Sequence, residues 1–171
     1  RFLLEYAISD NTTFGMQYLG NANSPNIIGT TTSSIFDTDD KLERSLINQG
    51  DNRINTKNHT LNFHLLTALD SLGKSISFDA DYFTFNSENS HDFFTEEYNN
   101  SGNLQATNSA ALNISNQAIE NFSAKIDIAF PLEKVNLSYG IKTSFTNTKS
   151  DVLYYNTISG SAVLDPNRSN E

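Results

Sequence analysis

The sequence predicts an all-β protein, an antiparallel up-and-down meander of about eight strands. Apolar and polar residues alternate with a period of two in several segments, helical periodicity is scarce, and short turn clusters separate the alternating segments. The composition is polar, since 23 Asn, 20 Ser and 16 Thr account for 59 of the 171 residues. A strand needs apolar residues on one face only, so alternation is compatible with this composition.

The clearest hairpin covers residues 58–86. Its first strand places Leu61, Phe63 and Leu65 on one face, and the cluster at residues 70–73 supplies a turn in which Gly73 suits a positive φ. The return strand alternates apolar Ile76, Phe78, Ala80 and Tyr82 with polar Ser77, Asp79 and Asp81. A register slip of one residue would put both aspartates on the apolar face, so the register is well specified.

A second hairpin covers residues 118–149. Phe122, Ala124, Ile126, Ile128 and Phe130 share a face, and Pro131 ends the strand because it cannot donate to a ladder. Val135, Leu137, Tyr139 and Ile141 then alternate with polar residues. A weaker hairpin is expected from residues 27–36 and 42–47, joined by a turn at residues 37–40.

The connections between strands are expected to be of two kinds, short turns and long polar loops. The long loops are expected at residues 21–26, 49–58, 86–103 and 151–171. Short turns at one end of a sheet and long loops at the other are typical of an outer-membrane β-barrel, whose strands need about 9–11 residues to cross the bilayer. A soluble β-sandwich would show the same alternation, so it remains an alternative.

A barrel assigns a role to each strand face. In a membrane only a closed barrel pairs all backbone N–H and C=O groups of its strands, and the outer face of each strand then contacts lipid. We expect the apolar residues on that face, and examples are Phe63, Leu65, Ile126 and Ile141. The polar face lines the lumen. The candidates for that face are Asp79, Asp81, Lys125, Asp127 and Lys142.

Two stretches resemble a known family. Residues 69–82, with the sequence LDSLGKSISFDADY, and the hairpin at residues 121–142 resemble the barrel region of the TonB-dependent-receptor-like outer-membrane proteins of Bacteroidetes. The resemblance extends over about residues 55–150 and is thin at both ends. It implies a barrel of about 22 strands, an N-terminal plug domain, and import powered through contact between TonB and the plug.

The chain departs from this family pattern, since it has no recognisable plug or TonB-contacting segment and no terminal aromatic residue. Residues 1–171 are therefore expected to be a partial outer-membrane barrel domain that could not transport by itself. Its expected partners are outer-membrane lipid, the remaining barrel and plug of the parent protein, and TonB through that plug. The expected location is the bacterial outer membrane.

Composition and motifs argue against most other chemistry. A net charge of −9 without a basic cluster disfavours nucleic-acid binding, and the absence of Cys excludes thiolate metal sites and thiol nucleophiles. Asp37, Asp39 and Asp40 lack the Gly and Glu of a calcium loop. The segment Gly73-Lys74-Ser75 lacks the first glycine of a phosphate-binding loop. We therefore expect no enzyme activity, no cofactor and no metal site.

One feature suggests ligand contact. Phe93, Phe94 and Tyr98 lie in the expected polar loop at residues 86–103, where exposed aromatic rings could stack on a sugar or anchor a partner. A strand extension beyond the membrane is the alternative for this segment.

The favoured interpretation of the whole chain is a barrel segment of a TonB-dependent receptor for ligand uptake. The alternatives are a complete small eight-stranded barrel with an adhesin or structural role, and a soluble β-sandwich binding module.

Overall fold

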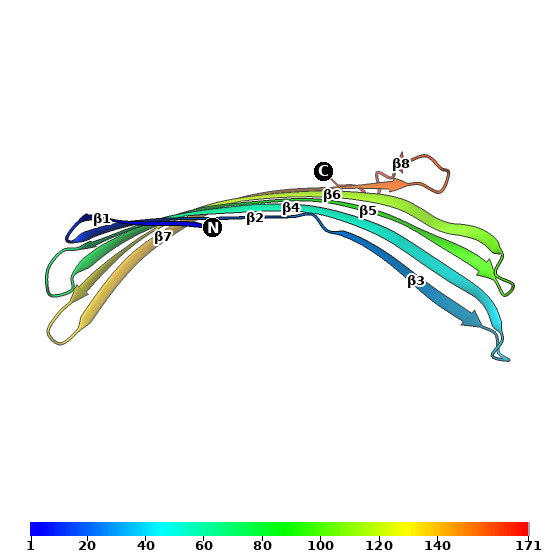
Figure 1. Ribbon diagram of the computed structural model, residues 1–171, viewed down its shortest axis with the longest axis horizontal. Helices are drawn as coiled ribbons and strands as arrows, with labels where there is room; N and C mark the ends of the chain where they lie inside the picture. The colour runs from blue at the N-terminus through cyan, green and yellow to red at the C-terminus, as the bar shows by residue number, and fades with distance from the viewer. Residues whose placement is uncertain (171) are drawn as a thin grey trace. The chain divides into compact units, whose positions relative to one another are not determined.

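The computed structural model describes residues 1–170 as eight strands in one antiparallel sheet (Figure 1). This confirms the predicted all-β meander. No helix within these residues is long and apolar enough to cross a membrane. The strands are β1 Phe2–Ser9, β2 Thr12–Asn23, β3 Asn26–Phe36, β4 Leu42–Ala68, β5 Ser75–Asn99, β6 Leu104–Pro131, β7 Asn136–Asn156 and β8 Val163–Leu164.

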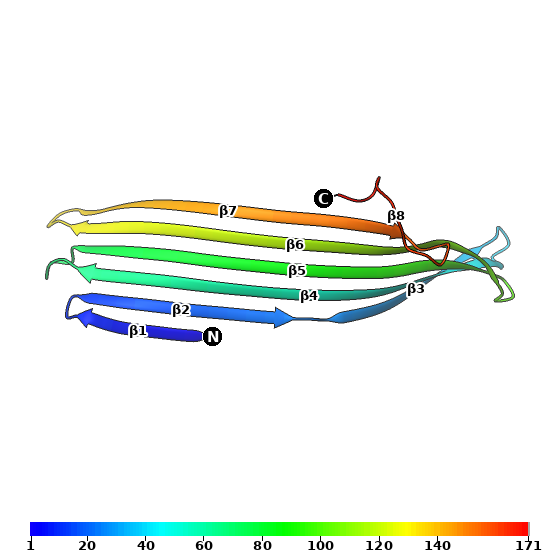
Figure 2. The same cartoon turned by 90° about the horizontal axis from the view of Figure 1, so that it is seen from above.

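The sheet order follows the chain, β1-β2-β4-β5-β6-β7-β8, and β3 pairs with β4 (Figure 2). β1 and β2 pair from Phe2↔Tyr18 to Ser9↔Thr12. β3 and β4 pair from Asn26↔Arg53 to Phe36↔Leu42, which confirms the weakest of the three predicted hairpins.

The expected long loops at residues 49–58 and 86–103 are wrong. β4 runs without interruption through residues 49–58, and β5 continues to Asn99. β4, β5 and β6 have 27, 25 and 28 residues, more than twice the 9–11 that a bilayer crossing needs. These Asn- and Ser-rich stretches carry no apolar alternation, and backbone pairing does not require it, so they resemble loops in sequence although they are strands.

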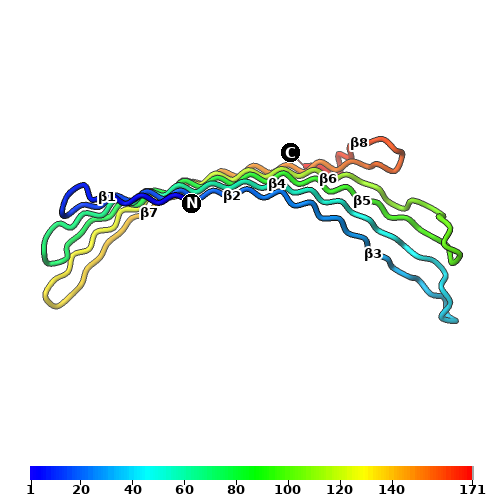
Figure 3. Tube along the Cα trace, viewed as in Figure 1, coloured from blue at the N-terminus to red at the C-terminus, as the bar shows by residue number. Residues whose placement is uncertain are grey.

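A tight turn joins β3 to β4, where a short connection was expected, and another joins β5 to β6, where a long loop was expected (Figure 3). In the β3–β4 turn, the N–H groups of Asp39 and Lys41 donate to Asp37 Oδ1, each at 2.9 Å. In the β5–β6 turn, the N–H groups of Ser101 and Asn103 donate to Asn99 Oδ1 at 3.0 and 2.9 Å. The expected contrast between short and long connections is therefore absent from these hairpins.

The chain divides into two compact units, and β4, β5, β6 and β7 contribute residues to both. Unit 1 comprises Arg1–Ala22, Lys57–Asn86 and Ala118–Lys149, and unit 2 comprises Asn23–Thr56, Ser87–Gln117 and Ser150–Glu171.

Residues 1–170 form one sheet and supply no second layer that packs on it. Among residues 1–170, Ala111 and Ser123 are the only buried residues. A β-sandwich buries one face of each sheet in a shared core. The sandwich alternative is therefore wrong, and whatever covers this sheet is not supplied by residues 1–170.

Candidate functional site

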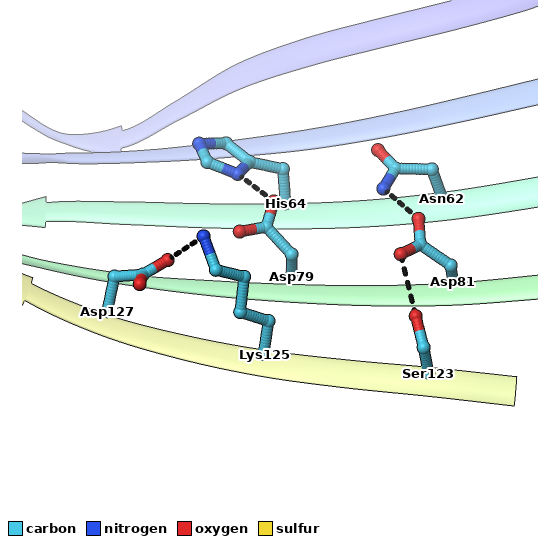
Figure 4. A network of polar contacts seen from close by, with 7 residues as sticks. All are labelled: Asn62, His64, Asp79, Asp81, Ser123, Lys125 and Asp127. Atoms are coloured by element: carbon cyan, nitrogen blue, oxygen red, sulfur yellow. Dashed lines mark hydrogen bonds and ion pairs between the residues drawn. The ribbon is translucent and has the colours of Figure 1, made fainter. Parts of the chain in front are cut away.

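Unit 1 carries a row of paired polar side chains across β4, β5 and β6 (Figure 4). His64 Nδ1 lies 2.6 Å from Asp79 Oδ1, and Asn62 Nδ2 donates to Asp81 Oδ1 at 2.7 Å. On β6, Ser123 Oγ donates to Asp81 Oδ2 at 3.0 Å. Lys125 Nζ lies 2.5 Å from Asp127 Oδ2. We call these seven residues the polar face: Asn62, His64, Asp79, Asp81, Ser123, Lys125 and Asp127.

The turn between β4 and β5 sets this arrangement. Leu69 N donates to Lys74 O at 2.8 Å, and Asp70 Oδ1 accepts the N–H groups of Leu72 and Lys74. Closure at this point places even-numbered residues of β4 beside odd-numbered residues of β5. Because side chains alternate along a strand, the polar members of the hairpin gather on one side.

Asp81 is the best-supported carboxylate of the polar face. Both of its oxygens accept a hydrogen bond, one from Asn62 on β4 and one from Ser123 on β6. Ser123 is 5% exposed. Asp81 therefore links three strands through side-chain contacts that are independent of the backbone ladder.

Glycines flank the polar face. An added Cβ at Gly140 would collide with Asp127 Oδ1, so the carboxylate occupies the space that a side chain at this position of β7 would fill. On the other side, the nearest atom to a Cβ at Gly15 would be the Cβ of His64, at 3.7 Å. Gly140 therefore allows Asp127 to lie over the neighbouring strand.

Four of the five predicted polar-face residues are brought together, and the fifth is not. Asp79, Asp81, Lys125 and Asp127 lie in the network. Lys142 lies on β7, and no ion pair of residues 1–170 includes it. Their partners Asn62, His64 and Ser123 were not among the predicted residues. A signal for Asn62 and His64 was present, since both alternate with Leu61, Phe63 and Leu65.

The opposite side of the same strands is apolar and exposed. We call it the apolar face. Ile141 is 72% exposed and Phe145 67%, which is unusual for large hydrophobic side chains in regular strands. Phe14 and Phe63 pack as a ring pair with centroids 6.3 Å apart. Other exposed members are Phe78, Tyr82, Phe122, Ile126, Phe130 and Tyr139.

A Tyr–His pair joins β2 to β4 in unit 1. The Tyr18 hydroxyl shares a 2.7 Å hydrogen bond with His59 Nδ1, and the rings stack with centroids 6.0 Å apart. A Cβ at Gly20 would lie 2.7 Å from the Tyr18 hydroxyl oxygen, so glycine is what leaves room for this ring. The sequence analysis missed the pair because its members are 41 residues apart.

In unit 2, Phe93, Phe94 and Tyr98 lie in strand β5, not in a loop. Phe93 and Phe94 are neighbours in a strand, so they point to opposite sides. Phe93 packs against His91 with ring centroids 5.2 Å apart, and the Tyr98 hydroxyl donates to Glu96 Oε2 at 2.7 Å. The three rings therefore do not form one aromatic cluster.

Glu97 links three strands of unit 2. Asn108 Nδ2 donates to Glu97 Oε2 at 3.0 Å, and Arg44 Nη1 lies 3.2 Å from Glu97 Oε1. The hydrogen bond from Asn108 and the contact with Arg44 lower the pKa of Glu97. Together with the Asn48–Thr95 hydrogen bond of 2.9 Å, this contact adds side-chain support to the long hairpins.

Metal binding has no support in the part of the chain that the structure describes. Residues 1–170 contain no group of three or more His, Asp or Glu side chains that could hold an ion. The seven residues of the polar face are instead paired with one another, an arrangement that satisfies polar side chains on a surface.

Comparison with known proteins gives the family. Residues 67–171, more than half of the chain, match the family model described as the outer membrane protein beta-barrel family. No curated protein matches the chain. The matched residues include β5, β6 and β7, which hold most of the polar and apolar faces. The chain belongs to the outer membrane protein β-barrel family and is a protein of the bacterial outer membrane.

Proposed function

We propose that this chain forms part of the wall of a TonB-dependent receptor that takes up a ligand across the outer membrane. In this proposal the apolar face of unit 1 contacts lipid and the polar face lines the lumen. The chain's own contribution is structural and not catalytic. Its partners are outer-membrane lipid, the rest of the barrel, a plug domain and, through that plug, TonB.

The observation that carries the proposal is how the polar face satisfies its own groups. His64 pairs with Asp79, Asp81 pairs with Asn62 and Ser123, and Lys125 pairs with Asp127, all along the sheet. An eight-stranded barrel has an interior just wide enough to be filled by side chains from its opposing walls. Polar groups that find partners within the wall suit a wide lumen, which a barrel of about 22 strands encloses.

Strand length supports the same proposal. β4, β5 and β6 extend well past the length that a bilayer crossing needs. Long hairpins that project from a barrel can surround the entrance to its lumen, where a ligand would first be met. In this interpretation unit 2 belongs to the extracellular side.

Cross-linking tests the width of the barrel. The chain has no cysteine, so a double variant with Ala7→Cys in β1 and Lys142→Cys in β7 can be treated with a short bismaleimide without background. In a wide barrel these strands are separated, and we expect no intramolecular cross-link. A small barrel closed by β1 against β7 would give an efficient cross-link, and that result would overturn the proposal.

Transport by the full-length protein in its own cells tests the uptake step. We expect accumulation of the ligand to be lost when the gene is deleted, when TonB is deleted, and when the proton-motive force is dissipated. Accumulation that persists without TonB would contradict the TonB-dependent role while leaving the barrel itself unaffected.

A further inference from the structure

Unit 2 contains a hollow beside the break between β2 and β3. The break falls at Ser24 and Pro25, and Pro25 has no N–H to donate to β4. The chain stays attached to β4 because Ile54 N donates to Pro25 O at 3.0 Å. The hollow measures about 520 Å³. This volume lies within the range of small-ligand sites, about 300–1,000 Å³.

Asn and Ser are the commonest of the residues that line the hollow, although most of the lining surface itself is apolar. Amides donate through nitrogen and accept through oxygen, and a serine hydroxyl does both. Pro25 and Ile114 add apolar surface. The amide and hydroxyl residues whose side chains share this side of the sheet are Ser24, Asn26, Asn55, Ser90 and Asn116, because side chains alternate along β4 and β5.

Hydrogen bonds with neighbouring side chains hold several of these polar side chains in place. Ser24 Oγ donates to Asn55 Oδ1 at 3.2 Å, and Asn116 Nδ2 donates to Asp151 Oδ2 at 2.9 Å. A site whose polar groups are already oriented loses less entropy when a ligand binds.

The charges of the hollow disfavour an anionic ligand. Arg53 and Glu88 both line it, and Asp51 already pairs with the guanidinium of Arg53, so Glu88 adds a negative charge that Arg53 does not cancel. Arg53 Nη2 also lies 2.6 Å from Asp51 Oδ2, and this contact raises the pKa of Arg53. A guanidinium that already has a carboxylate partner is a poor receptor for a phosphate, but it can still donate to a hydroxyl.

We propose that this hollow binds a saccharide. Ring hydroxyls of a sugar donate and accept, as the Asn and Ser side chains do, and the C–H face of a sugar ring fits the apolar surface of Pro25 and Ile114. Two sources supply this chemistry at a bacterial surface, the saccharide headgroup of an outer-leaflet glycolipid and a free oligosaccharide. The inference concerns unit 2 alone and does not depend on TonB-dependent uptake.

Binding to the purified full chain in detergent tests the proposal, with two probes compared by saturation-transfer difference NMR and titration calorimetry. One probe is an uncharged O-antigen oligosaccharide released from lipopolysaccharide, and the other is maltoheptaose. We expect at least one to bind. Binding of the first alone indicates the glycolipid headgroup, and binding of maltoheptaose indicates a free oligosaccharide. Absence of binding by both probes overturns the proposal.

Variants locate the binding. Ser90→Trp fills the hollow and should weaken binding at least tenfold, whereas Asn26→Ala removes one amide and should weaken it about threefold to tenfold. Asn48→Ala is the matched control, because Asn48 pairs with Thr95 in the same unit and does not line the hollow. Heat-modifiable gel migration verifies that each variant is folded. Equal affinity in the folded wild type, Ser90→Trp and Asn26→Ala would place the saccharide elsewhere and contradict the assignment.

Discussion

At the scale of single residues, one turn construction occurs three times with different side chains. Asp37, Asp70 and Asn99 each accept the N–H groups of the second and fourth residues that follow. In each turn the third residue after the acceptor has positive φ, namely Asp40 at 58°, Gly73 at 94° and Gly102 at 77°. A short Asx side chain thus satisfies the backbone donors of a tight hairpin.

The β4–β5 turn should depend on the Asp70 carboxylate. We expect Asp70→Ala to lower the unfolding midpoint in urea, because two turn N–H groups lose their acceptor. Asp70→Asn keeps an acceptor oxygen and should retain most of the stability. Detergent-solubilised protein followed by circular dichroism gives the measurement, and equal midpoints for the two variants would contradict this role.

The pH dependence of this turn has a defined sign. Backbone hydrogen bonding by Lys74, followed by its side-chain contact and the Leu72 N–H, lowers the pKa of Asp70. The stabilisation is complete above the unfolded pKa of about 3.9 and is lost as pH falls through the lower folded pKa. Wild type should therefore approach Asp70→Asn in stability at strongly acidic pH, because a protonated carboxyl keeps one carbonyl oxygen as an acceptor for the Leu72 and Lys74 N–H groups.

Gly140 and Asp127 should be energetically coupled. Gly140→Ala places a Cβ where Asp127 Oδ1 now lies, so the carboxylate must move and its contact with Lys125 weakens. We expect Gly140→Ala to lower the unfolding midpoint in wild type but to have little effect in an Asp127→Ala background. A double-mutant cycle measures this difference, and additive effects would show that the two residues act independently.

At the scale of elements, the main result is the length of the strands. The alternating segments at residues 58–86 and 118–149 were predicted because an apolar face imposes a period of two. Residues 49–58 and 87–99 carry no such pattern, and their pairing depends on backbone hydrogen bonds with neighbouring strands. Sequence alternation therefore detects a strand only where one face meets an apolar environment.

Hydrogen exchange distinguishes long strands from long loops. We expect slow exchange for amides of residues 49–58 and 87–98, because these residues lie inside β4 and β5. The amide of Asn100, in the tight turn that follows, should exchange fast and serve as the internal control, because Asn100 lies outside the strands. Fast exchange throughout residues 49–58 would restore the loop interpretation.

At the scale of the whole molecule, the sheet exposes large apolar side chains in place of burying them. Ala111 is the only buried hydrophobic residue within residues 1–170. More than half of the residue surface is exposed in large apolar residues such as Ile141, Phe145, Tyr6 and Ile28. A soluble protein with this surface would aggregate. In an outer-membrane barrel, lipid covers such an apolar surface, which is consistent with membership of a membrane-barrel family.

A charge on the apolar face should destabilise the membrane-embedded protein, whereas the same charge on the polar side should not. Ile141→Arg places a guanidinium at a site that is now 72% exposed and apolar, and we expect a cost of about 2–4 kcal/mol if this position lies near the bilayer midplane. Ser138→Arg, three residues earlier on the other side of β7, is the control and should change stability little. Urea unfolding from lipid vesicles measures both, and equal costs would contradict the assignment of the faces.

The sequence by itself determined the strand character, the two main hairpins and the separation of polar from apolar residues, because alternation and turn chemistry are local. It also placed Asp79, Asp81, Lys125 and Asp127 on a polar side. The tertiary structure decided their partners, since Asn62, His64 and Ser123 reach them only through pairing between strands. It also decided the length of the hairpins and the hollow at Pro25, which depend on neighbouring strands that no local pattern encodes.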